Sequence, residues 1–343
     1  MPVTVHRSAI SEFGTITDQV GIKASVKTLY EARKRMLFYR FGMEEDMPKH
    51  QSTTLNFRRW MNIDPVTAPI QGSTTPDPAT QSYKDVTVTL RQYGIWVPQP
   101  SYIADTISDP VLTRAINALG YNMKTCYETI AFNTLRMGAA VFYPDGTTTL
   151  DRAFVGTGAG KGVVTLNLIR SVIEYFEGKN VEPITELIQA KTSVGTEPVE
   201  DAYIFVCHSD LARSIRDVPG FQPYSEYPTQ GSILPGELGR VENARFVRHN
   251  FCVPWKGAGA AELTVKNTAG KADVYPILVF GKEAFGVSKL KGSEFNKVLV
   301  ANAEVTASDP LGQRGTAGWT GWSGIKILEN DYMARLEVTS PKN

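Results

Sequence analysis

The chain has 343 residues, 36 basic against 35 acidic side chains and 42% hydrophobic residues. This length predicts a sizeable buried core divided among roughly two or three domains. The sequence contains no apolar run near the ~20 residues of a membrane helix and begins without the apolar core of a signal peptide, so we expect neither a membrane partner nor export. A formal charge of +1 excludes the basic excess with which proteins hold DNA by counterion release.

Three cysteines, Cys126, Cys207 and Cys252, are odd in number and far apart. This pattern argues against a disulfide framework and for a reducing compartment. We expect all three to be buried thiols.

Residues 1–45 predict an N-terminal arm. A basic cluster (Arg33, Lys34, Arg35 and Arg40) is interleaved with apolar residues between Ile22 and Phe41. A helix with a basic edge is favoured over nucleic-acid contact, because Glu44, Glu45 and Asp46 follow directly.

Residues 46–100 predict a projecting hairpin. Two β-rich segments, Thr53–Met61 and Tyr83–Val97, flank a linker of about twenty residues rich in proline, threonine and glycine, which is too long for a tight turn. An isolated hairpin is marginal in water, so we expect this one to lie against another surface, such as a second copy of the chain.

Aromatic and cationic residues gather at the base of this hairpin: Phe57, Arg58, Arg59, Trp60 and Trp96. These residue types most often anchor interfaces, and we expect them to contact a neighbouring subunit. The alternative is that Trp60 and Trp96 pair across the hairpin and contact only their own chain.

One long amphipathic helix is predicted over residues 110–138. Ser108, Asp109 and Pro110 form a helix-start signal, and apolar residues then recur at three- and four-residue spacing from Val111 to Met137, before Gly138. At 1.5 Å per residue the helix would span about 40 Å and act as a strut.

The stretch GTGAGKG, residues 156–162, resembles a phosphate-binding loop but fails at defining positions. A Walker A loop needs glycine where Val155 stands and Ser or Thr where Gly162 stands, and a dinucleotide fingerprint is broken by Lys161. We expect a mobile loop followed by an amphipathic helix from Leu166 to Phe176, capped by Thr165, and no cofactor. A nucleotide-binding enzyme remains the less favoured alternative.

Two further patterns suggest chemistry that the spacing does not support. His208, Ser209 and Asp210 are adjacent, and neighbours on a strand point apart rather than converge as a triad. Cys207 and His208 with His249 and Cys252 lack the usual ligand spacing of a zinc site. We expect no catalytic and no metal-binding residues.

The remaining segments are inclined to β-structure. We expect strands at Tyr203–Cys207, Arg245–Arg248, Val274–Phe280 and Ile325–Val338, and a short helix capped by Ser209. Residues Lys256–Lys271 are small and polar and predict a mobile loop. Trp319 and Trp322, in the segment GTAGWTGW, suit packing of large rings against a partner.

The order of these segments resembles that of the major capsid proteins of tailed bacteriophages. The local sequence motifs resemble those of one family of these proteins, which is shared by certain short-tailed phages. The matching phrases are FRRW (57–60), DPVLTRAINALGYNMKTCYETI (109–130), FVCHSDLARSIRDVPGF (205–221) and DPLGQRGTAGW through ARLEV. The resemblance covers roughly residues 40–340. It departs at Ser209, where the family often has proline.

The resemblance implies an α+β fold shared with the herpesvirus capsid floor. Its parts would be an N-terminal arm (1–45), an extended hairpin loop (46–100), a peripheral domain (101–200) with a spine helix (110–138), an axial domain (201–300) and return strands of the peripheral domain (301–343).

The resemblance also implies a structural protein rather than an enzyme. It would assemble with itself into the pentamers and hexamers of an icosahedral shell, enclosing double-stranded DNA with weak contact. Further partners would be a portal, a separate scaffold protein and a decoration protein, and the location would be the virion capsid, assembled in the host bacterial cytoplasm. Another oligomeric virion protein, such as a tail or sheath component, is the alternative.

Overall fold

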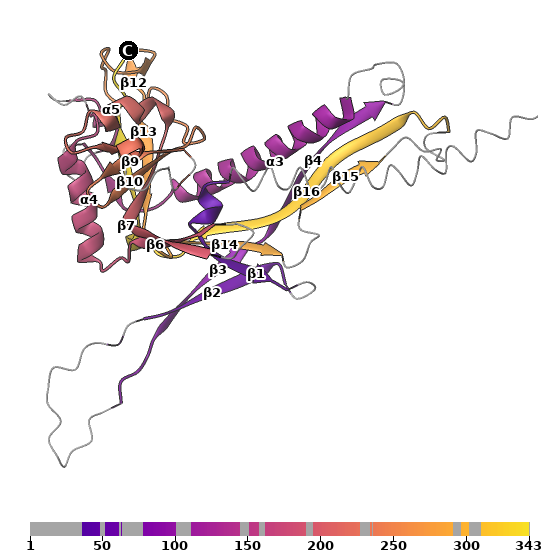
Figure 1. Cartoon of the computed structure of the whole chain (residues 1–343), viewed down its shortest axis with the longest axis horizontal. Coiled ribbons are helices and arrows are strands. Elements are labelled where there is room, and N and C mark those ends of the chain that lie inside the picture. Colours follow the sequence, from indigo (N-terminus) through magenta and orange to yellow (C-terminus); the bar gives the residue numbers. More distant parts are fainter. Residues whose placement is uncertain are drawn as a thin grey trace, which may run out of the picture.

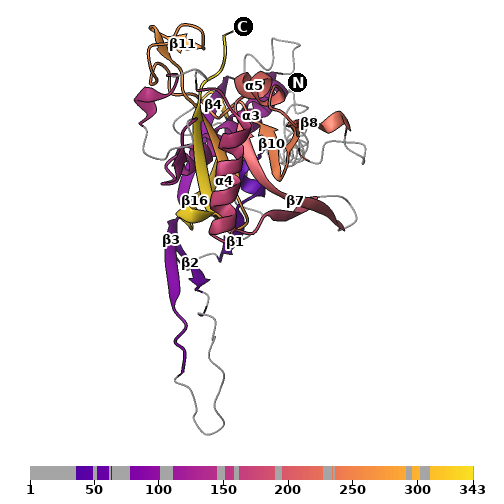
Figure 2. The same ribbon diagram turned by 90° about the vertical axis from the view of Figure 1, so that its left-hand side faces the viewer.

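The computed structural model describes residues 36–48, 52–61, 63, 78–100, 111–144, 151–157, 162–189, 195–226, 234, 236–290, 296–301 and 310–342. Figure 1 shows three parts: a compact body at one end, an elongated plate that runs away from it, and a thin hairpin that projects from their junction. Figure 2, turned by 90°, shows the hairpin still projecting clear of the rest.

The elements have the following bounds. The α-helices are α3 (Val111–Leu135), α4 (Leu166–Gly178) and α5 (Ala212–Arg216). The strands are β1 (Met43–Met47), β2 (Thr54–Trp60), β3 (Tyr83–Thr89), β4 (Arg91–Pro100), β5 (Val141–Phe142), β6 (Ile184–Gln189), β7 (Gly195–Cys207), β8 (Gln222–Pro223), β9 (Glu237–Val241), β10 (Ala244–Arg248), β11 (Asn267–Thr268), β12 (Lys271–Ala272), β13 (Tyr275–Phe280), β14 (Phe285–Leu290), β15 (Asn296–Ala301), β16 (Arg314–Ile327) and β17 (Met333–Val338).

The compact body is built on a sheet in the order β5-β17-β13-β7-β10-β9-β8, with β6 paired to β7. Helix α4 covers one face, because its five apolar residues at helical spacing are all buried: Leu168, Ile169, Val172, Ile173 and Phe176. Thr165 caps this helix by accepting a hydrogen bond from the Leu168 amide at 3.3 Å, as the sequence predicts.

The plate consists of β1, β4, β14, β15 and β16 with helix α3. Strand β16 is its centre: β4 pairs with one edge, while β14 and β15 pair with the other. Helix α3 covers one face, where Leu119, Met123 and Tyr127 pack on Ala317 and Trp319. The predicted long helix is therefore confirmed, at 25 residues, and spans about 37 Å.

An apolar core joins the plate to the compact body. Phe132 and Leu135 from the end of α3 pack with Phe285 of β14 and with Leu278 and Phe280 of β13. The strands of each sheet come from distant parts of the chain, so the expected boundaries at residues 200 and 300 do not separate the two bodies. Helix α4 belongs to the compact body, β14 to the plate, and β17 returns to the compact body.

Several local expectations need correction. The segment Tyr83–Val97 breaks at Leu90 into β3 and β4, and Ile325–Val338 breaks into the end of β16, a short 3-10 turn and β17. The stretch 256–271 is ordered by pairing of β11 with β12 and by backbone hydrogen bonds such as Lys266 N to Ser340 O at 2.8 Å. The small, polar residues of this stretch gave no local signal of its distant hydrogen-bond partners.

The remaining local expectations are mixed. The strands predicted at 245–248 and 274–280 are confirmed within one residue as β10 and β13, and the strand predicted at 203–207 is the final part of β7, which begins eight residues earlier at Gly195. The 3-10 turn after β7 is capped by His208 rather than Ser209, since His208 Nδ1 accepts from the Asp210 amide at 3.1 Å. The helix-start signal at 108–110 and the greater part of the N-terminal arm lie outside the described residues. The arm's described end forms a 3-10 turn at Phe38–Arg40, and the acids that follow it lie on β1.

Candidate subunit interface

The hairpin is the antiparallel pair β2–β3, with Phe57 opposite Val86, Arg58 opposite Asp85, and Trp60 opposite Tyr83. Successive side chains of a strand point to opposite faces, so this register divides the hairpin in two. Arg58, Trp60, Tyr83 and Asp85 lie on one face, called here the outward face. Phe57, Val86, Arg59 and Lys84 lie on the other, the inward face.

The outward face is held in one arrangement by its own side chains. Arg58 donates two hydrogen bonds to the Asp85 carboxylate, at 2.9 and 3.0 Å, and its guanidinium lies 4.3 Å from the centre of the Tyr83 ring. These hydrogen bonds keep the pKa of Asp85 below its usual range. The Trp60 ring meets the Tyr83 ring edge-on at 5.4 Å, yet the two residues remain 54% and 52% exposed.

The inward face attaches the hairpin to its own chain. Phe57 is only 3% exposed and packs where Gly286 of β14 leaves room, since a Cβ added at Gly286 would lie 2.9 Å from the ring. Lys326 of β16 also donates a hydrogen bond to the Thr87 carbonyl at 3.2 Å. Phe57 therefore stabilises the hairpin base and offers little surface to a neighbour.

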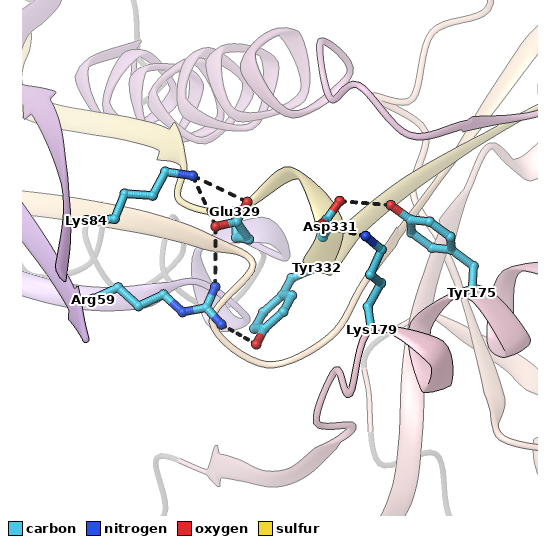
Figure 3. A network of polar contacts seen from close by, with 7 residues as sticks. All are labelled: Arg59, Lys84, Tyr175, Lys179, Glu329, Asp331 and Tyr332. Atoms are coloured by element: carbon cyan, nitrogen blue, oxygen red, sulfur yellow. Dashed lines mark hydrogen bonds and ion pairs between the residues drawn. The ribbon is translucent and has the colours of Figure 1, made fainter. Parts of the chain in front are cut away.

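A polar network continues this attachment two residues further along the hairpin (Figure 3). Lys84 Nζ lies 3.1 Å and Arg59 Nη1 3.5 Å from the same oxygen, Glu329 Oε2. Arg59 also donates to the Tyr332 hydroxyl and stacks on that ring, with its guanidinium carbon 4.1 Å from the ring centre. Glu329 and Tyr332 belong to the turn between β16 and β17.

The same turn is tied to helix α4 of the compact body (Figure 3). Asp331 accepts hydrogen bonds from the Tyr175 hydroxyl at 3.0 Å and from Lys179 Nζ at 3.2 Å. Burial acts to raise the pKa of Asp331, but the hydrogen bonds from Lys179 and Tyr175 outweigh it and leave that pKa lowered. Burial, together with Asp331, raises the pKa of Tyr175 to about 12, so its hydroxyl stays a donor.

Trp96 lies apart from the hairpin, on β4 opposite Gly318 of β16. Because Trp319 faces helix α3 and side chains alternate, Trp96 is on the plate's other face, where it is 65% exposed. The proposed pairing of Trp60 with Trp96 is therefore wrong: Trp60 pairs with Tyr83. The five residues singled out from sequence divide among three surfaces.

Tyr83 and Asp85 complete the outward face, and the sequence reasoning missed both of them. Their signal was present: if the hairpin closes over residues 61–82, the residue opposite Trp60 is Tyr83. Trp319 also differs from expectation, because it is 2% exposed and donates a hydrogen bond to Asn122 of α3 at 3.1 Å rather than facing a partner.

Other candidate sites show no convergent chemistry. Residues 158–161 of the glycine stretch lie outside the described part. A small depression beside its described ends is lined by Tyr143, Pro144, Phe154, Val155, Gly156, Thr157 and Gly162. None of these seven lining residues carries a charged side chain.

The cysteines differ in burial and do not form part of a metal-ligand cluster in the described residues. Cys207 and Cys252 are buried as predicted, whereas Cys126 is half-buried, and burial raises the pKa of Cys207 to about 12. Among the described residues, no three His, Cys, Asp or Glu side chains gather as metal ligands. Within the same residues, no helix has the length and apolar character needed to cross a membrane.

No protein-family model matches the chain. A curated relative, the major capsid protein of Pseudomonas phage KPP21, is 23% identical over 172 residues, which cover 46% of this chain and only 42% of that relative. The match thus spans less than half of the relative's length.

Solved structures match over nearly the whole chain. The capsid of Ralstonia phage GP4 aligns with a TM-score of 0.64 and 14% identity, covering 90% of this chain and 92% of the other. The head structure of Helicobacter pylori bacteriophage KHP40 gives 0.60 and 12%, covering 88% of each chain. The capsid of Cyanophage P-SCSP1u gives 0.57 and 13%, covering 88% and 87%. The fold expected from the sequence is confirmed: this chain has the fold of bacteriophage capsid proteins.

Proposed function

We propose that the chain is a major capsid protein that assembles with itself into the pentamers and hexamers of an icosahedral shell around phage double-stranded DNA. The fold shared with phage capsids supports this role, as does the curated relative named a major capsid protein. The role is structural: the protein's work is to bind further copies of itself with a defined geometry.

The observation that carries the proposal is the outward face of the hairpin. Arg58, Trp60 and Tyr83 are exposed, yet already fixed by contacts with each other and with Asp85. Aromatic and arginine side chains dominate interface energies, and a pre-ordered cluster loses little freedom when it binds. We propose that this face docks on a neighbouring subunit and that Trp96 on the plate makes a second contact.

Further partners follow from the proposed role. A shell filled with DNA needs a portal, and we propose that a separate scaffold protein guides assembly and that a decoration protein can bind outside. The net charge of +1 favours weak contact with the enclosed DNA. We place the protein in the virion capsid, after assembly in the host bacterial cytoplasm.

Electron microscopy of the expressed protein tests the proposal. We expect closed shells with five- and six-fold rings. Tubes would favour a tail or sheath component, and a monomer that persists at high concentration would contradict self-assembly altogether.

Deletion of residues 62–82, with a short turn joining β2 to β3, tests the hairpin in particular. The described base of the hairpin keeps its attachment through Phe57, so the subunit should still fold. We expect a strong loss of particle yield; full yield would show that residues 62–82 are dispensable, because β2, β3 and their outward face remain in this variant.

A further inference from the structure

The turn between β16 and β17, residues 329–332, forms a mechanical link that we call the elbow. One end of it holds the hairpin and the other holds the compact body (Figure 3). Glu329 contacts Arg59 and Lys84 of the hairpin, while Asp331 contacts Tyr175 and Lys179 of α4. Four consecutive residues thus connect two parts of the molecule that are far apart in sequence.

The hairpin end of the elbow neutralises a repulsion. Arg59 and Lys84 lie directly opposite each other across β2–β3 and on the same face. Like charges in this position destabilise a strand pair. Glu329 is only 17% exposed in its side chain and contacts both cations, so the hairpin's inward face is electrostatically complete only when it lies against the elbow.

Tyr332 joins the two ends. Arg59 donates a hydrogen bond to its hydroxyl and stacks on its ring. The Tyr332 side chain also packs against the apolar cores on either side of the eight-stranded sheet. A displacement of α4 that carries Asp331 must therefore move Tyr332 and the hairpin contact beside it.

The attachments at the base of the hairpin differ in strength from those further out. Phe57 is a buried apolar pivot against Gly286. The ion pairs of Arg59 and Lys84 lie further out, where those side chains are 35% and 52% exposed, and such pairs are individually weak. The part of the hairpin beyond Phe57 can therefore swing by breaking only the outer contacts, while Phe57 and the hydrogen bond from Lys326 to the Thr87 carbonyl hold the base.

We infer that the elbow is an electrostatic latch: with Glu329 bound to Arg59 and Lys84 it fixes the angle between hairpin and compact body, and on release the hairpin swings about Phe57. The use of this motion rests on the proposed function, because subunits in rings of five and of six must present the hairpin to their neighbours at different angles.

Distance measurement between spin labels on the unassembled subunit tests the latch. One label replaces the exposed Met61 beside the hairpin and the other replaces Arg213 on α5, in a chain carrying Cys126→Ser; Cys207 and Cys252 are buried. Glu329→Gln should broaden and shift the distance distribution. The matched control is Glu182→Gln, which removes an exposed pair with Lys282, 3.0 Å away, and should leave the distribution unchanged.

A salt titration tests the latch in the labelled chain that keeps Glu329, without any substitution in the elbow. Raising the ionic strength from 0.1 to 1 M shortens the screening length from about 10 Å to about 3 Å, so it should broaden the distribution as Glu329→Gln does. The latch would be overturned if the labelled chain with Glu329 and its Glu329→Gln variant gave equally narrow distance distributions. Microscopy of the same samples reports separately on the proposed function: a broadened distribution without shells leaves the latch standing, whereas shells with an unchanged distribution exclude it.

Discussion

The side chains of β2 divide their contacts by the pleat of the strand. Phe57 and Arg59 face the protein's own body, whereas Arg58 and Trp60 face solvent beside Tyr83 and Asp85. A period of two is visible in any sequence, but the choice of buried face depends on Gly286, more than two hundred residues away. This is why the sequence indicated a cluster of anchor residues without separating those that hold the hairpin from those that remain available.

Trp60→Ala should impair assembly and leave folding intact. The indole is 54% exposed, so its removal changes little inside the subunit. Truncating an interface anchor commonly costs about 2 kcal/mol or more, which corresponds to a rise of about thirtyfold in the protein concentration needed for particles. Light scattering during assembly measures this, and circular dichroism checks the fold. Trp60→Phe, which keeps an aromatic ring, should recover most of the yield; equal yields for all three chains would remove Trp60 from the interface.

A buried acid and a buried histidine meet where the N-terminal segment, α3 and the turn after β10 converge. Glu128 is fully buried, its Oε1 accepts the Leu37 amide at 2.6 Å, and its Oε2 lies 3.1 Å from His249 Nε2. Burial raises the pKa of Glu128 to about 7, although the backbone hydrogen bonds and Lys124 oppose this shift. Burial lowers the pKa of His249 to about 4, and Lys124 acts in the same direction.

Glu128→Gln should change how stability depends on pH. The raised pKa of Glu128 contributes stability that is complete below pH 4.5 and lost as the pH rises to about 7; at about 1.4 kcal/mol per pK unit the loss is about 3 kcal/mol. The depressed pKa of His249 acts oppositely, losing stability as the pH falls from 6.5 to about 4, so the two effects offset in the native chain.

The variant keeps only the histidine effect, so its stability relative to the native chain should rise between pH 4.5 and 7. Urea unfolding at pH 5 and pH 8 measures this. Glu177→Gln, at an exposed glutamate on α4, is the matched control and should show the native dependence. Parallel curves for Glu128→Gln and the native chain would contradict the assigned pKa.

Helices and strands were predictable to different degrees. Helix α4 follows from Thr165 and five apolar residues at helical spacing, since its cap and its buried face are both local. The break at Leu90 between β3 and β4 has no local signal: the two strands join different sheets, and only the partners on β2 and β16 separate them. Among the strands of five residues or more, β1, β6, β9, β14 and β15 were not predicted from the sequence.

Thr165→Ala should destabilise the protein by about 1 kcal/mol, because the Leu168 amide loses its side-chain acceptor. Urea unfolding followed by circular dichroism measures the change. Ser171→Ala is the control in the middle of the same helix, where the serine hydroxyl donates only to the Asn167 carbonyl and alanine is the better helix former. A loss for Ser171→Ala equal to that for Thr165→Ala would show that the cap contributes nothing.

At the scale of the whole molecule the chain is elongated, with plate and hairpin leading away from the compact body (Figure 1). A compact protein of 343 residues has a radius of gyration of about 20 Å. We expect small-angle scattering from the unassembled subunit to give a clearly larger value. A value near that of a compact sphere would mean that the hairpin folds back on its own body.

The arrangement of the two bodies was the least predictable feature. The residue patterns predicted the hairpin and the long helix, and the resemblance to phage capsid proteins gave the fold class, but that resemblance assigned successive blocks of residues to successive domains. The chain instead passes between the bodies several times: α3 leads from the plate to β5, β13 leads back to β14, and β16 leads through the elbow to β17. Such crossings depend on strand pairing over long sequence distances, for which spacing and composition carry no information.

The alternation of β2 has an evolutionary consequence. If the outward face is the subunit contact, the even-numbered positions 58 and 60 can change together with the surface that they contact, whereas the odd-numbered positions 57 and 59 are constrained by the interior of their own subunit. Substitutions on the outward face would then alter which copies recognise one another without disturbing the residues that support the hairpin beneath it.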